Sequence, residues 1–275
     1  MMCAWKELLA ILPGNIRQDV DCLGKKDLLE LHMRVDSVPE LILNGGVRWL
    51  SQKSTPGDLS HIINAASRYS PWSASTLSQG YLTAPGGHRI GVCGAAVCIG
   101  EKMSGIREIE SLCIRVARDY TGLADSLSSL RDSLLILGAP GWGKTTLLRD
   151  LARIIAKDQV TGVIDERKEL FPSGFLRGKR MHVMTSCPKN IGVEIMLRTM
   201  GPEWIVVDEI TADQDCCALI QAANCGVKLL ATAHGTGTQD LYARSTYRPL
   251  MEHNIFKRVL ILRMDKSWSL ERVGS

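Results

Sequence analysis

A glycine-rich stretch in the second half of the chain has the residue types and spacing of a phosphate-binding loop. Residues 138–145 read Gly-Ala-Pro-Gly-Trp-Gly-Lys-Thr and match the pattern G-x-x-x-x-G-K-[ST] without a mismatch. The glycines let the backbone curl so that successive N–H groups point at phosphate oxygens, and a following helix adds the positive end of its dipole. We therefore expect Lys144 to reach the β- and γ-phosphates of a nucleotide and Thr145 to bind Mg²⁺.

The whole loop is expected to contact the nucleotide. For Trp142, packing against a neighbour is favoured over covering the nucleotide, because large aromatic side chains serve mostly to bury area. The expected nucleotide-binding residues are Gly138, Ala139, Pro140, Gly141, Trp142, Gly143, Lys144, Thr145 and Thr146.

Two acidic residues follow the apolar run 204–207, which has the composition of a buried strand. Ligands of doubly wound sheets bind at the carboxyl ends of the strands, so this pair is expected beside the phosphate loop. We assign Asp208 to Mg²⁺, held directly or through water, and Glu209 to orienting and deprotonating an attacking water. The alternative, a solvated acidic turn, is disfavoured by the phosphate loop about 65 residues upstream.

Two further strand ends carry polar residues. Asp165, Glu166 and Arg167 follow the apolar run 160–164. Glu166 is a candidate for water activation or the outer coordination of Mg²⁺, and a plain salt-bridged loop remains the alternative. Thr232 and His234 follow another apolar run, where a polar tip could sense the γ-phosphate; a structural histidine is the alternative.

The elements that must position these residues alternate along the second half of the chain. Strand-like apolar runs alternate with stretches of helical spacing, which predicts a parallel sheet with helices on both faces. The expected strands are residues 134–137, 160–164, 204–207, 227–231 and 259–262. The expected helices are residues 145–156, 190–200, 213–223 and 240–253.

The first part of the chain has turn-rich, short-period patterning, which predicts a small α+β module with an antiparallel sheet. A glycine-rich β segment is expected over 86–100, with two arms, 88–93 and 95–99, on either side of Gly94. The other expected strands are 31–35, 39–43, 47–50 and 113–117, with a hairpin turn at 44–46 and helices at 58–69 and 73–80. We place the domains at 1–118 (α+β), 119–131 (linker) and 132–275 (P-loop domain).

Composition and charge exclude several classes of protein. With 45% hydrophobic and 23% charged residues over 275 positions, the chain is an ordinary globular protein, not a disordered or collagen-like one. Its net charge of +4 is not the strong basic footprint of a nucleic-acid-binding protein. Nine irregularly spaced cysteines without a C-x-x-C pair indicate a reducing cytosol and argue against a zinc ribbon. Because no apolar run approaches about 18 residues, we expect membrane association only through partners.

Together these segments resemble the type II/IV secretion ATPase family of P-loop proteins. The matching residues are the Walker A pair Lys144-Thr145, the acidic box Asp165-Glu166, the Walker B pair Asp208-Glu209 and the His-box residue His234. The phrases at 86–92, 105–109, 114–118 and 146–150 are similar to a sporulation branch of that family. Asp208 stands where many members have glycine, and the acidic box lacks its usual proline. Both Glu166 and Glu209 therefore stay open as the main base; Glu209 is favoured because it directly follows the Mg²⁺ acid.

The resemblance implies a RecA-like P-loop ATPase domain with a parallel sheet, preceded by a small α+β domain. It also implies a homohexameric ring with nucleotide at the junction of the two domains and between neighbours. Arginines of the first domain then reach the γ-phosphate, and the candidates are Arg89, Arg107 and Arg115, for which a structural role is the alternative. The sporulation branch implies a cytoplasmic protein of the mother cell, with membrane proteins of a channel to the forespore as partners.

We therefore expect an enzyme that hydrolyses ATP with Mg²⁺ by in-line attack of water. A nucleic-acid-associated P-loop ATPase remains an alternative, although we expect no direct nucleic-acid contact. A scaffold in which ATP only locks an assembly interface is the other. A small-molecule kinase is disfavoured, because the sequence contains no lid segment or acceptor-binding motif.

Overall fold

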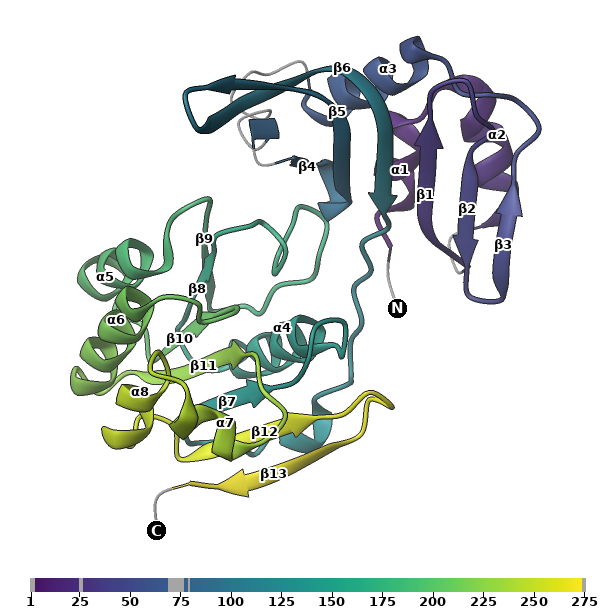
Figure 1. The fold of residues 1–275 in the computed structure, drawn as a ribbon. Coiled ribbons are helices and arrows are strands. Elements are labelled where there is room, and N and C mark those ends of the chain that lie inside the picture. Colours follow the sequence, from purple (N-terminus) through teal and green to yellow (C-terminus); the bar gives the residue numbers. More distant parts are fainter. Residues whose placement is uncertain (1–2, 25–26, 69–76, 79, 274–275) are drawn as a thin grey trace. The chain divides into compact units, whose positions relative to one another are not determined.

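The computed structural model describes residues 3–24, 27–68, 77–78 and 80–273. The chain forms two compact units, Met1–Asp119 with Pro172–Phe175, and Tyr120–Phe171 with Leu176–Ser275. The described residues form one hydrophobic core in the first unit and two in the second, and Figure 1 shows the elements of both units. Among the described residues, no helix combines the length and the apolar character that crossing a membrane requires.

The first unit is an antiparallel sheet with helices packed on it. Its strand order is β3-β2-β1-β6-β5-β4. Alternate strand residues enter the core, so that Leu31 and Met33 of β1 are buried together with Leu8 and Ile62 from the helices. The helices are α1 (Trp5–Ile11), α2 (Gly14–Leu23) and α3 (Pro56–Ala66), and the strands are β1 (Leu28–Arg34), β2 (Glu40–Leu43), β3 (Gly46–Trp49), β4 (Tyr81–Thr83), β5 (Arg89–Ile99) and β6 (Lys102–Arg115).

Local sequence decides where the helices of this unit begin and end. Thr55 and Asp58 form a capping box with Pro56 in the first turn, so α3 begins earlier than the predicted helix 58–69. It ends at Ala66, because Arg68 takes a left-handed backbone with φ of 53°. Helices α1 and α2 have no side-chain cap and were not predicted. The predicted helix 73–80 falls mainly outside the described residues.

The predicted division of the glycine-rich β segment into two arms is wrong, because β5 runs straight through Gly94. Strand β5 pairs with β6 along its length, and the register shifts around Gly94. A Cβ atom at Gly94 would lie 2.5 Å from the carbonyl oxygen of Glu108. The glycine therefore permits close approach of two backbones at a bulge and does not form a turn. The predicted strand 113–117 overlaps the end of β6, which stops at Arg115.

The second unit has a mostly parallel sheet with the order β13-β12-β7-β11-β10-β8-β9. Strands β12 and β13 pair antiparallel, and the other pairings are parallel. The predictions did not include β9 and β13. The strands are β7 (Leu134–Leu137), β8 (Thr161–Asp165), β9 (Met181–Thr185), β10 (Trp204–Val207), β11 (Lys228–Ala233), β12 (Arg258–Leu262) and β13 (Trp268–Arg272). The helices are α4 (Lys144–Ile155), α5 (Lys189–Thr199), α6 (Asp213–Asn224), α7 (Thr238–Ala243) and α8 (Arg248–Glu252).

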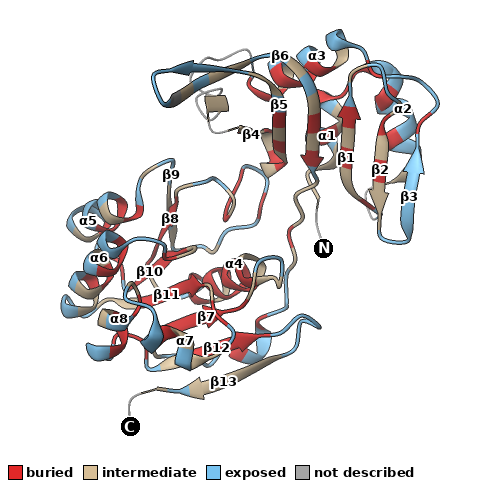
Figure 2. Ribbon diagram, in the orientation of Figure 1, coloured by how far each residue is buried: buried red, intermediate tan, exposed pale blue. Residues whose placement is uncertain are grey.

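Alternate side chains of these strands feed two cores on opposite faces of the sheet. Leu135 and Leu137 pack with residues of α5, α6 and α8, whereas Leu134 and Ile136 pack with residues of α4. Figure 2 shows β7, β10 and β11 buried along nearly their whole length. A strand covered on both faces needs apolar residues at every position, which explains the continuous apolar runs in the sequence. The prediction of helices on both faces is confirmed.

The predicted helix 240–253 is broken into α7 and α8. Arg244 follows α7 with an extended backbone. Pro249 lies in the first turn of α8. Proline has no N–H to donate, so it is tolerated at a helix start but disrupts the middle of a longer helix.

Candidate active site

The predicted phosphate loop connects the end of β7 to the start of α4. Gly141 and Gly143 have φ angles of 76° and 101°, left-handed values that favour glycine. Helix α4, which is 12 residues long, has no side-chain cap at its N-terminus. Its first-turn N–H groups and the positive end of its dipole therefore meet at the loop, as in an anion-binding site.

The Lys144 side chain folds back onto this loop. Its Nζ donates to the carbonyl oxygen of Gly138 at 2.8 Å and to that of Ala139 at 3.1 Å. Burial lowers the pKa of Lys144, against the opposing effect of the Asp208 and Glu209 carboxylates. A carbonyl carries no full charge, so a phosphate oxygen would be a stronger partner for this ammonium group.

Asp208, directly after β10, is bonded to two hydroxyl groups. Its Oδ2 accepts from Thr145 Oγ1 at 2.8 Å, and its Oδ1 accepts from Thr232 Oγ1 at 2.6 Å. The Thr232 oxygen also accepts the backbone N–H of Glu209 at 2.7 Å. The structure thus brings the two predicted Mg²⁺ ligands, Thr145 and Asp208, together, and their oxygens suit a hard cation. Thr232, a candidate phosphate sensor, is fully buried and braces β10 against β11.

The Glu209 carboxylate is held from two sides. Its Oε1 lies 2.7 Å from Nε2 of His234, and its Oε2 lies 3.0 Å from Nη1 of Arg167. The Nδ1 atom of His234 lies 3.2 Å from Lys144 Nζ. Because an ammonium group can only donate, Nδ1 of His234 accepts the hydrogen bond from Lys144. Nε2 then carries the ring proton and donates a hydrogen bond to Glu209. Lys144, His234 and Glu209 therefore form one hydrogen-bonded chain.

Electrostatics keep Glu209 ionised. Burial alone would raise the pKa of Glu209, but the hydrogen bond from His234 and the charges of Arg167 and Lys144 outweigh it and leave that pKa below its ordinary value. The residue also has a φ of 52°, a left-handed value that is uncommon outside glycine. Such backbone outliers cluster at functional sites.

The acidic pair at the end of β8 has different partners, beginning with those of Asp165. Its carboxylate accepts the backbone N–H groups of Glu169, Leu170 and Phe171 at 2.8, 3.0 and 2.9 Å. Burial raises the pKa of Asp165, and these hydrogen bonds oppose that rise. Asp165 therefore closes the turn after β8.

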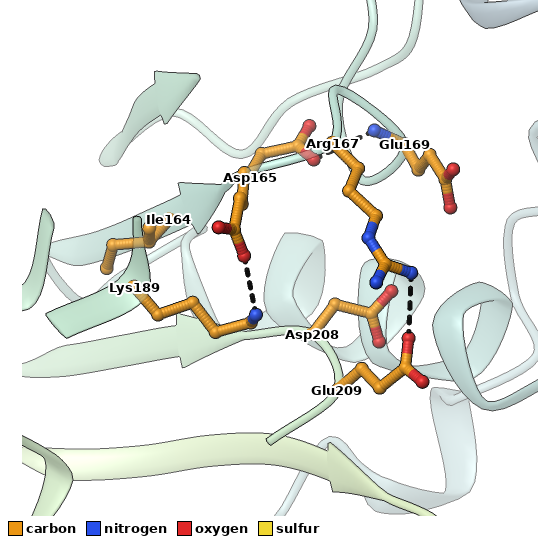
Figure 3. Close-up of a pocket in the computed structure, with 8 residues that line it drawn as sticks. Ile164, Asp165, Arg167, Glu169, Lys189, Asp208 and Glu209 are labelled. Carbon is orange, nitrogen blue, oxygen red and sulfur yellow. Dashed lines mark hydrogen bonds and ion pairs between the residues drawn. The ribbon is translucent and has the colours of Figure 1, made fainter. Parts of the chain in front are cut away.

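Glu166 binds Lys189, the first residue of α5. Its Oε2 lies 2.6 Å from Lys189 Nζ, which is also 4.0 Å from Asp215. Sequence reasoning missed Lys189, because no spacing in the chain links this helix start to the end of β8. The two acidic pairs line one pocket, shown in Figure 3, whose lining residues are Ile164, Asp165, Glu166, Arg167, Glu169, Lys189, Asp208 and Glu209.

A second lysine that the sequence did not reveal contacts the phosphate loop. Lys266, in the turn between β12 and β13, donates from Nζ to the carbonyl oxygen of Gly141 at 2.8 Å. Its turn lies more than a hundred residues from the loop in sequence, so only the folded chain joins them. Trp142 is half-buried, and both interpretations of its role stay open.

The candidate arginines lie in the first unit, on β5 and β6. Arg89 and Arg115 pair across the two strands. The Arg89 guanidinium lies 4.4 Å from the centroid of the Tyr81 ring, and Arg115 Nε lies 3.3 Å from Glu30 Oε1. Arg107 is exposed and comes earlier on β6 than Arg115, opposite Ala95 of β5. The structure thus groups two of the three, and contact with a phosphate stays a prediction.

Nearly the whole chain matches one protein family. The sequence model of the family described as "Sporulation stage III, protein AA" matches residues 4–270. "Stage III sporulation protein AA" of Bacillus subtilis (strain 168) is 35% identical over 278 residues, which cover 93% of this chain and 90% of that protein. "Uncharacterized protein ycf45" of Porphyra purpurea is 28% identical over 260 residues, which cover 90% of this chain and 43% of that protein.

Solved structures share the fold. The ATPase DotB of Legionella pneumophila aligns with a TM-score of 0.62 at 16% identity, over 95% of this chain and 81% of that chain. The pilus retraction motor PilT, solved with bound ADP, aligns with a TM-score of 0.64 at 14% identity, over 95% of this chain and 83% of that chain. This likeness confirms the predicted fold class, a RecA-like α/β P-loop domain preceded by a small α+β domain.

Proposed function

We propose, from the premise that the chain belongs to the sporulation stage III protein AA family, that it binds ATP with Mg²⁺ and hydrolyses it. One observation carries the proposal: the Thr145 hydroxyl and the Asp208 carboxylate meet at 2.8 Å beside the phosphate loop, with Glu209 next to them. A cation site and a carboxylate for water thereby occupy adjacent positions, as phosphoryl transfer to water requires. The ADP bound to PilT supports an adenine nucleotide as the ligand.

The loop holds the nucleotide in this proposal. Its N–H groups bind phosphate oxygens, and Lys144 exchanges its carbonyl partners for the β- and γ-phosphates. Thr145 and Asp208 hold Mg²⁺, which neutralises phosphate charge when bound. Lys266, which already donates to Gly141 of the loop, adds positive charge there.

Glu209 orients the attacking water and accepts its proton. A carboxylate with a lowered pKa is a weak base, so its main contribution is to place the water for in-line attack. That suffices for a loose transition state, in which the leaving bond is largely broken before the new bond forms. Arg167 and His234 are positioning residues, because they act through Glu209. We assign Glu166 a supporting role, because Lys189 occupies its carboxylate.

We further propose that the protein works as a homohexameric ring in the cytoplasm, with membrane proteins of a sporulation channel as partners. The 35% identity to a stage III sporulation protein supports a role in sporulation. In this ring Arg89, Arg107 and Arg115 supply charge to the γ-phosphate, and ATP turnover powers or assembles a channel from mother cell to forespore. Light scattering with and without ATP tests the ring. A strict monomer in both conditions, with partners present, would contradict it.

Replacing the loop lysine tests the catalytic assignment. We expect Lys144→Ala to lower ATP turnover by at least about 10²- to 10³-fold, because the transition-state phosphate loses the ammonium group of the loop. Lys157→Ala is the matched control, since Lys157 is exposed just after α4. Turnover is measured as phosphate release, and ATP binding by calorimetry. Wild-type hydrolysis by Lys144→Ala would refute the assignment. ATP binding without turnover by the wild-type chain, alone and with partners, would favour the scaffold alternative.

A further inference from the structure

Three metal-ligating side chains gather on the sheet of the first unit. Glu30 and His32 are two residues apart on β1, so both leave the same face of the strand. Cys113 of β6 pairs in register with His32, which puts its side chain on that face as well. Leu31 and Met33 of β1 point the other way, into the core. The antiparallel register alone thus places a carboxylate, an imidazole and a thiol at neighbouring positions.

The ligand atoms are spaced as they would be around one small cation. Cys113 Sγ lies 3.7 Å from His32 Nε2 and 3.8 Å from Glu30 Oε2, and the last two atoms are 2.9 Å apart. A tetrahedral Zn²⁺ ion with bonds of about 2.0–2.3 Å holds its ligand atoms roughly 3.3–3.6 Å apart. Each observed distance therefore differs from the tetrahedral one by only a few tenths of an ångström, within reach of side-chain rotation.

The surroundings orient the carboxylate and leave room beside the thiol. Arg115 Nε lies 3.3 Å from Oε1 of Glu30, so the other oxygen, Oε2, faces His32 and Cys113. Hydrogen bonds of this kind orient metal-binding carboxylates. Gly91, which pairs with Cys113 from β5, has no side chain to cover the cluster. The side chains of Glu30 and His32 are 31% and 26% exposed, so an ion can enter without unfolding.

We propose that Glu30, His32 and Cys113 bind a divalent transition-metal ion, with Zn²⁺ as the best fit, and leave a fourth position for water or an external ligand. Thiolate and imidazole prefer such borderline-soft ions to Mg²⁺, whereas the all-oxygen pair Thr145 and Asp208 has the opposite preference. The positive charge of Arg115 opposes a second cation nearby. We therefore expect weaker binding than at a closed, cysteine-rich structural site.

Metal titration of the full chain tests this site. Zn²⁺ is added in the presence of saturating Mg²⁺ and followed by calorimetry, and Co²⁺ is used as a spectroscopic probe. We expect one equivalent of Zn²⁺, a thiolate-to-cobalt charge-transfer band and the d–d bands of a tetrahedral site. Absence of saturable Zn²⁺ binding, or a Co²⁺ spectrum without the thiolate band, would overturn the proposal.

Variants locate the binding on these residues. His32→Gln and Cys113→Ser should each weaken Zn²⁺ binding by more than about 100-fold, because loss of even an outer partner costs 10–100-fold. Cys98→Ser, an exposed cysteine of β5, is the matched control and should bind as the wild type does. Melting curves without metal check that each variant folds. The Zn²⁺-induced rise in Tm should disappear in His32→Gln and Cys113→Ser and should remain in Cys98→Ser. Wild-type affinity in both of them would place the metal elsewhere and refute the site.

Discussion

Two strand ends of the second unit carry the same residue pair, Asp-Glu, and the fold gives the two pairs different partners. After β8, backbone N–H groups surround Asp165, and Glu166 forms an ion pair with Lys189. After β10, two threonine hydroxyls bind Asp208, and His234 and Arg167 hold Glu209.

The partners decide whether a carboxylate is free for chemistry. The N–H groups on Asp165 belong to the turn itself, so a ligand could displace them only by undoing the turn. Arg149 reinforces that turn, because its buried guanidinium donates to the carbonyl oxygens of Glu169 and Leu170. A hydroxyl bound to Asp208 can instead rotate and become a cation ligand beside the carboxylate. Asp165 is thus built into the fold, whereas Asp208 is available to a ligand.

The largest expected contrast is between the two glutamates. Glu209→Gln should lower kcat for ATP hydrolysis by about 10²- to 10⁴-fold while ATP still binds, because the amide has one acceptor oxygen in place of two to orient the water and cannot take up its proton. Glu166→Gln should affect kcat far less and should mainly destabilise the fold, because buried Lys189 loses its nearer counter-charge, at 2.6 Å, and keeps only Asp215 at 4.0 Å. Single-turnover hydrolysis and ATP binding are the measurements. Glu252→Gln, at an exposed site of α8, is the control. If Glu166→Gln lost more kcat than Glu209→Gln, Glu166 would be the residue that orients the water and Glu209 the supporting one.

A smaller contrast is expected between the two aspartates. Asp165→Asn should lower the free energy of unfolding by about 1–3 kcal/mol. The side-chain NH₂ of asparagine would face backbone N–H groups, and it cannot accept their hydrogen bonds. Asp208→Asn should be tolerated better in urea unfolding, since its hydroxyl partners can both donate and accept. It should instead raise the Mg²⁺ concentration needed for half-maximal hydrolysis. An equal shift in Mg²⁺ dependence in Asp165→Asn would mean that both pairs serve the cation.

The smallest expected effect is a difference in pH dependence. The pKa of Glu209 lies below its ordinary value of 4.5, so its contribution to stability is complete above that pH and is lost on acidification. The pKa of Asp165 lies above its ordinary value of 3.8, so folding favours its protonated form and its contribution improves on acidification. Urea unfolding of the wild type, Glu209→Gln and Asp165→Asn from neutral pH to about 3.5 should give wild-type-minus-variant differences of opposite slope. Slopes of the same sign would contradict the comparison.

Much of the candidate site could be predicted because its features are local. The spacing of glycines in residues 138–143 dictates the loop backbone, and the capless start of α4 follows from the same residues. The apolar runs that became β7 and β10 are continuous because both faces of the sheet are covered, so their ends could be located. Gly94 shows the limit of such reasoning. Its role depends on Glu108 of the partner strand, and the sequence pattern alone suggested two arms.

The sequence by itself determined the phosphate loop, the two acidic strand ends and the alternation that makes a parallel sheet, because each depends on residues close together in the chain. Only the tertiary structure decided which acidic pair meets Thr145. In the sheet order β7-β11-β10-β8, strand β10 lies closer to β7 than β8 does, and no local pattern encodes that order. The same holds for Lys189 at Glu166, Lys266 at the loop and the Glu30, His32 and Cys113 cluster. These contacts join residues distant in sequence, and only the packing of the strands and turns brings them together.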